Sequence, residues 1–122
     1  MAKSYHYALE KLRNAVRTLA VAPGDVRNRL IKAYLQCHTL DESHFPSKLK
    51  KKWRFIEKNL TKSGPVCKEW NGELWIGSVE NTMDHIYNKT GTKIARQVYD
   101  LYETLLMLGF EEKGTSLDKK TK

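Results

Sequence analysis

The chain has 122 residues and a net charge of +8, with 40% hydrophobic and 30% charged residues. This length predicts a single domain with a core of its own. No apolar run approaches the roughly 18 residues that a membrane span needs, and the N-terminal sequence mixes charged and apolar residues unlike a secretory signal, so we expect a cytoplasmic bacterial protein with no membrane partner.

The first two predicted elements are helices joined by a tight turn. Apolar residues recur at three- and four-residue steps over residues 5–21, which predicts an amphipathic helix. The following sequence, APGD, predicts a stop and a restart, in which the carboxylate of Asp25 caps a second helix that reaches about residue 37. On the second helix Ile31 and Leu35 lie almost opposite the other apolar residues, so we expect this helix to be packed between two neighbours.

A third helix is predicted over residues 46–60, after a polar loop. Pro46 suits the first helical position, because its missing N–H has no helical partner there. At about 100° per residue, one narrow apolar stripe must be buried: Leu49, Trp53, Ile56 and Leu60. The opposite side carries four cations within roughly 100° of arc, with no carboxylate among them: Lys50, Lys51, Arg54 and Lys58. We call these four residues the basic ridge.

The region after the third helix predicts a small β-hairpin. The dipeptide Asn71-Gly72 can supply the two positive-φ residues of a tight turn. We therefore expect a short hairpin or turn near residues 66–76. Large aromatic side chains beside a turn are usually lids over a core, so we expect Trp70 or Trp75 to pack on the helices.

Two further helices complete the predicted fold. Ser78 is expected to cap a short helix, and Gly91 to kink or interrupt the chain before the last helix. The last helix is expected to end at Gly109, with Phe110 folding back on its final turn. Residues 111–122 contain one apolar residue and are predicted to form a disordered basic tail.

Together these elements predict an all-α fold, a single-domain bundle of four to five helices over residues 1–110. Three motifs also occur within residues 8–62: Ala8-Leu9-Glu10-Lys11-Leu12, Gly24-Asp25 followed by Arg29-Leu30, and Phe45-Pro46 at the start of a basic helix. On these motifs the chain loosely resembles a group of small uncharacterised helical proteins of bacteria and mobile elements. The resemblance implies a helical fold, and it assigns no activity and no functional residue.

The positive charge is concentrated in the first half of the chain. Lys and Arg exceed Asp and Glu by nine over residues 1–62, whereas the remaining residues sum to −1. This asymmetry favours an anionic partner, either nucleic acid or an acidic protein surface, although a basic patch can also serve solubility alone. The basic ridge is the expected contact surface, and Arg13, Arg17, Arg27 and Arg29 extend it if the first two helices pack alongside.

Patterns typical of catalysis or metal binding are weak. Cys37, His38 and His44 are close in sequence, but helical phase turns Cys37 inward and away from His38, and no paired cysteine spacing occurs. No glycine-rich phosphate loop or nucleophile elbow is present. We therefore predict no enzyme, metal or cofactor, and the alternative is a small nuclease or hydrolase centred on His38 and His44. A third interpretation is a homodimer formed through exposed aromatic residues: Trp70, Trp75 or Phe55.

Overall fold

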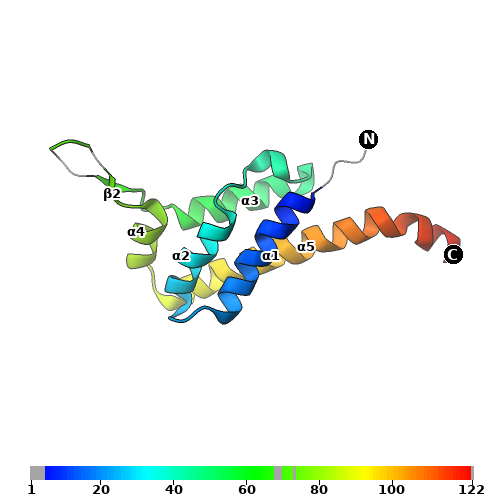
Figure 1. The fold of residues 1–122 in the computed structure, drawn as a ribbon, viewed down its shortest axis with the longest axis horizontal. Coiled ribbons are helices and arrows are strands. Elements are labelled where there is room, and N and C mark those ends of the chain that lie inside the picture. Colours follow the sequence, from blue (N-terminus) through cyan, green and yellow to red (C-terminus); the bar gives the residue numbers. More distant parts are fainter. Residues whose placement is uncertain (1–4, 68–69, 73, 122) are drawn as a thin grey trace.

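Helices make up most of the chain. The computed structural model describes the backbone of residues 5–67, 70–72 and 74–121 and, within these ranges, all side chains except those of residues 75 and 110–121. In chain order the elements are α1 His6–Val21, α2 Val26–Cys37, the short 3-10 helix η1 Glu42–His44, α3 Ser47–Leu60, β1 Val66–Cys67, β2 Leu74–Ile76, α4 Ser78–Asp84 and α5 Asn88–Thr121. The predicted all-α single-domain bundle is confirmed (Figure 1).

Helix α5 is the common support of the bundle. It packs against α1, α2 and α3, while α1 and α2 pack closely against each other and α4 lies against α2 and α3. Beyond these contacts α5 runs on past the other helices (Figure 1). One continuous apolar core joins the helices. Among the described residues, no helix combines the length and the apolar character needed to cross a membrane.

The turn between α1 and α2 forms as its residues predict. The N-cap Asp25 accepts the backbone N–H of Asn28 at 3.1 Å, and Gly24 takes a φ of +96° that favours glycine. The expectation that α2 is packed on two sides is only half right, because Ile31 is partly buried against the core but Leu35 is 63% exposed. Leu35 lines a surface pocket together with Ser78 and Val79 of α4, so the side of α2 on which it lies is only partly covered.

Helix α3 has the rotational phase that its apolar spacing predicts. All four residues of its apolar stripe are buried, at no more than 2% exposure, and the indole of Trp53 stacks on Phe45 with ring centroids 5.3 Å apart. Pro46 is the N-cap and Ser47 the first helical residue, so the helix begins one residue later than expected. Because the stripe is buried, the opposite side of α3 must face solvent.

The predicted hairpin is present, but its Trp70 does not cover the core. Its strands are antiparallel, with Val66 paired to Ile76 and Cys67 to Leu74 across a local irregularity. Gly72 has the expected positive φ, +69°, but Asn71 does not, so the expected pair of positive-φ residues is only half right. The hairpin leaves the bundle at the α4 end (Figure 1), and Trp70 is consequently 78% exposed, so the expected packing of Trp70 on the helices is wrong. The side chain of Trp75 lies outside the described residues.

A buried threonine joins the base of the hairpin to α4. The Thr82 side chain is fully buried, and its hydroxyl donates to the Ser78 carbonyl at 2.7 Å and accepts the Ser63 N–H at 3.0 Å. Beside it, the Asn81 side-chain amide donates to the Gly64 carbonyl at 3.0 Å. These bonds satisfy backbone groups of the loop that leads from α3 to the hairpin.

The start of α5 differs from the sequence-based expectation. Gly77 is the N-cap of α4 and Ser78 its first residue, with no side-chain cap bond. Residues 85–87 form a non-helical connection between α4 and α5, and α5 then passes through Gly91 without interruption. A Cβ at Gly91 would lie 2.9 Å from Cγ1 of Val26. This glycine therefore permits the close approach of α5 to α2, and the predicted interruption at Gly91 is wrong.

The end of α5 differs as well. Gly109 is not among the described residues with positive φ, and α5 continues through it to Thr121. The predicted helix end at Gly109 is therefore wrong, and the backbone of residues 111–121 is helical where a disordered tail was expected. A glycine costs a helix only about 1 kcal/mol relative to alanine, so flanking residues that favour helix can carry the helix across it.

Candidate functional site on the outer face of α3

The basic ridge lies on the solvent side of α3. Lys51, Arg54 and Lys58 are exposed and Lys50 is half-buried, while Trp53 on the opposite side is 1% exposed. The separation of cations from the apolar stripe, on which the sequence-based interpretation depends, is thus present. The indole is not interleaved with the lysines in space.

Carboxylates approach one flank of the ridge. Glu42 of η1, which packs against α3, places Oε1 2.5 Å from Nε of Arg54. Burial raises the pKa of Glu57, and the negative charges of Asp41 and Glu42 raise it further. The side chains of Arg54 and Glu42 are 60% and 45% exposed, so solvent screens the pair and it contributes at most about 1 kcal/mol. The tertiary fold therefore places acidic neighbours beside the basic ridge that a helical-wheel projection of α3 alone does not show.

Two of the four arginines expected to extend the ridge have structural roles instead. The Arg27 guanidinium donates to the Asp25 carboxylate at 3.0 Å and to the Ile86 carbonyl at 3.2 Å, which ties α2 to the loop before α5. Arg29 donates to the Leu19 carbonyl at 3.0 Å, which ties α2 to the end of α1. Neither guanidinium joins the ridge, so this part of the expectation is wrong.

The other two arginines are exposed on α1. Arg13 and Arg17 lie on a helix that packs chiefly against α2 and α5. In Figure 1 the carboxyl ends of α1 and α3 lie well apart. The condition for a shared basic surface, that the first two helices pack alongside α3, is therefore not met.

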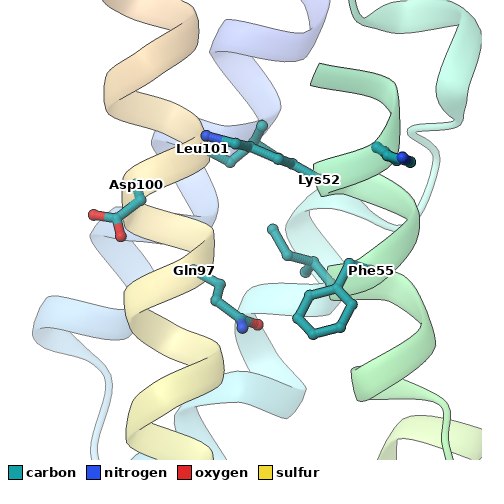
Figure 2. A pocket seen from close by; sticks show the side chains of 7 residues that line it. Lys52, Phe55, Gln97, Asp100 and Leu101 are labelled. Atoms are coloured by element: carbon teal, nitrogen blue, oxygen red, sulfur yellow. The ribbon is translucent and has the colours of Figure 1, made fainter. Parts of the chain in front are cut away.

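A groove between α3 and α5 adjoins the ridge (Figure 2). Its volume is about 500 Å³, and its lining comes from two helices: Lys51, Lys52, Phe55 and Ile56 of α3, and Gln97, Asp100 and Leu101 of α5. We call it the α3–α5 groove. Lys51 belongs to both the ridge and the groove, so the two features form one continuous surface.

The floor of the α3–α5 groove is apolar and its rims are charged. Ile56 and Leu101 are 2% and 1% exposed, which places them at the bottom, and the ring of Phe55 is 53% exposed along the wall. Figure 2 shows Lys52 stretched from α3 toward α5 beside Leu101, and Asp100 pointing away from the gap. The arrangement offers an apolar surface with cations along one edge.

One hydrogen bond bridges the two helices at the groove. Asn59 of α3 donates from its side-chain amide to Oε1 of Gln97 on α5 at 3.4 Å. In Figure 2 the Gln97 side chain enters the gap on the same side as the Phe55 ring. The helices are therefore held side by side, and the groove is a built feature of their packing.

Sequence reasoning missed Lys48 and Lys52, both of which are exposed. Together with Lys51 and Phe55 they repeat the three- and four-residue steps of one helix face, so a wheel centred on Phe55 instead of the ridge would have found them. No sequence signal shows that α5 lies beside this face. We call the five exposed cations of α3 the basic face: Lys48, Lys51, Lys52, Arg54 and Lys58.

The cysteine and histidines that the sequence offered for chemistry lie in different surroundings. His44 accepts the Asp41 N–H at Nδ1, at 3.0 Å, and its ring lies 5.0 Å from that of Tyr7. His38 is the exposed C-cap of α2. Cys37 is buried, and burial raises the pKa of its thiol to about 12. In the described part of the chain, no three His, Cys, Asp or Glu residues gather as metal ligands.

The exposed aromatic residues do not form one surface. Phe55 lies in the α3–α5 groove, whereas Trp70 lies on the hairpin beyond α4 (Figure 1). A homodimer would therefore use one of these surfaces at a time across a two-fold interface, or pair one with the other.

Comparison with known proteins adds no assignment. No protein-family model, curated protein or solved structure matches the chain. The resemblance to small helical proteins of bacteria and mobile elements therefore stays a prediction. What this protein does must follow from the chemistry of its own surface.

Proposed function

We propose that this is a non-catalytic binding protein that holds an anionic partner, nucleic acid or an acidic protein surface, on the basic face of α3. The supporting observation is that five cations are exposed on this helix, while its only carboxylate, Glu57, lies half-buried toward η1. Clustered charge of one sign raises the local potential and attracts ions of the opposite sign.

The spacing of these cations also costs the free protein stability. Lys48 and Lys52 are a like-charge pair four residues apart, and such a pair destabilises a helix by about 0.2–0.5 kcal/mol. At the second such pair, Arg54 and Lys58, the carboxylate of Glu42 compensates part of the charge. A patch that served solubility alone would do so equally well with dispersed charges of both signs. An anion bound across the basic face relieves this repulsion.

Salt dependence tests the proposal. Fluorescence anisotropy with a labelled oligonucleotide and with labelled poly-glutamate should show binding at low salt that weakens as salt rises. For nucleic acid held through about four phosphates, the log-log slope should be about −3 to −4. If neither the oligonucleotide nor poly-glutamate binds at the lowest salt, the proposed function is wrong.

A matched pair of double variants separates a local site from net charge. Lys51→Glu with Lys58→Glu reverses two cations of the basic face, and Lys32→Glu with Lys89→Glu reverses two exposed lysines on α2 and α5. Both variants change the net charge equally. We expect the first to weaken binding at least about tenfold more than the second, and equal losses would show that only net charge matters.

A further inference from the structure

The α3–α5 groove identifies the kind of anionic partner that the basic face fits. Phosphate-binding surfaces need cations and N–H donors along their length, yet the floor of this groove is formed by Ile56 and Leu101. The lining residues include a single amide side chain, Gln97, whose Oε1 accepts a hydrogen bond from Asn59. The floor therefore favours an apolar occupant over a nucleic-acid backbone.

The charges on the two rims are different. Lys51 and Lys52 are exposed on the α3 rim, and Asp100 is exposed on the α5 rim. Asp100 points away from the gap (Figure 2), so the charges that face an occupant of the groove are the two lysines of the α3 rim. A helix with an apolar stripe, with carboxylates on the flank beside α3, matches the apolar floor and the cationic α3 rim.

Two neighbouring helices with a half-exposed aromatic ring between them suit helix-in-groove recognition. In that mode, an amphipathic helix places side chains at three- and four-residue steps into an apolar groove. Phe55 keeps 53% of its surface exposed beside the buried Ile56, so an apolar side chain seated there would remove its exposed surface from water.

We propose that the partner is an acidic amphipathic helix of another protein, which seats its apolar stripe in the α3–α5 groove and its carboxylates on Lys51 and Lys52. This inference rests on the proposed function and narrows it. It adds an apolar contribution, centred on Phe55, to the electrostatic attraction of the basic face.

The test uses the full-length chain and four labelled probes. The first is a designed helical peptide of about 15 residues, with leucines at three- and four-residue steps and glutamates along one flank. The second has the same composition in scrambled order, the third is poly-glutamate, and the fourth is a single-stranded oligonucleotide. Affinities are measured by anisotropy, and the contact surface is mapped from amide shifts of the isotope-labelled protein.

We expect the amphipathic peptide to bind at least about tenfold more tightly than the scrambled peptide and to shift amides around Phe55, Gln97 and Leu101. Phe55→Ala should weaken this peptide about tenfold and leave poly-glutamate binding unchanged. Leu35→Ala is the matched control, because Leu35 is an apolar side chain of α2 that is 63% exposed and lies outside the groove. The Leu35→Ala variant should bind the peptide as tightly as the unmodified chain does.

Several outcomes would overturn the inference. If poly-glutamate binds as tightly as the amphipathic peptide, or if the oligonucleotide binds best, the proposed function stands and the acidic-helix partner is wrong. If light scattering shows a dimer that Phe55→Ala converts to monomer, the groove holds a second copy of this chain. If none of the four probes binds, the proposed function fails together with the inference.

Discussion

The close contact between α5 and α2 can be tested by adding one methyl group. In Gly91→Ala, the new Cβ would lie 2.9 Å from Val26 Cγ1, too short for an undisturbed contact. Its next neighbours, Arg27 Cγ at 3.5 Å and Leu30 Cδ1 at 3.6 Å, are at ordinary van der Waals distance. The expected strain therefore comes from a single methyl group of Val26.

Two opposing terms set the size of the effect. Overpacking a well-filled contact costs about 1–3 kcal/mol, whereas replacing a helical glycine by alanine gains about 1 kcal/mol. We expect Gly91→Ala to lower the free energy of unfolding by up to about 2 kcal/mol. In a Val26→Ala background the close methyl group is gone, and the same substitution should stabilise the protein by up to about 1 kcal/mol. The sign of the effect should reverse.

Urea denaturation followed by circular dichroism measures all four corners of this double-mutant cycle. Gly109→Ala is the matched control, because it changes another glycine of α5, and among the described side chains its Cβ would meet Leu9 Cδ1 at an ordinary 3.9 Å. It should stabilise the protein by up to about 1 kcal/mol. The reasoning is refuted if Gly91→Ala and Gly109→Ala are equally stabilising, or if Val26→Ala leaves the effect of Gly91→Ala unchanged. A destabilising Gly109→Ala would instead indicate a left-handed helix end at that residue.

Three further predictions concern polar and titratable groups. Thr82→Val removes a buried hydroxyl that both donates and accepts and should lower the free energy of unfolding by about 1–3 kcal/mol. The control Thr92→Val, at an exposed site of α5, should change it by less than about 0.5 kcal/mol. Equal losses in the two variants would contradict the role assigned to Thr82. A maleimide should label the exposed Cys67 rapidly. It should label Cys37, which is buried and whose pKa is raised to about 12, only when the protein unfolds. Rapid labelling of both thiols in the folded protein would be inconsistent with a buried Cys37. The raised pKa of Glu57 means that the folded chain binds its proton more tightly than the unfolded chain, so this group lowers stability as the pH rises from about 4.5 toward and through the folded pKa. Glu57→Gln should therefore gain stability relative to the unmodified chain between acid and neutral pH, and a pH-independent difference in urea denaturation would refute this.

Features that depend on near neighbours in the chain were readable from the sequence. The spacing of Leu49, Trp53 and Ile56 sets which side of α3 is buried, because a helix has a fixed rotation per residue. The Asp25 cap and the positive φ of Gly72 follow from side-chain and backbone chemistry within a few residues. The basic ridge could be placed on the solvent side of α3 for the same reason.

Features that depend on which helices meet were decided only by the tertiary structure. A glycine is compatible both with a helix break and with close helix packing, and it is the position of Val26 opposite Gly91 that distinguishes the two. Likewise, Glu42 reaches Arg54 because η1 folds onto α3, and the α3–α5 groove exists because two helices distant in sequence lie side by side. Local periodicity specifies the faces of each helix, whereas the partner of each face depends on how all the apolar stripes are buried together.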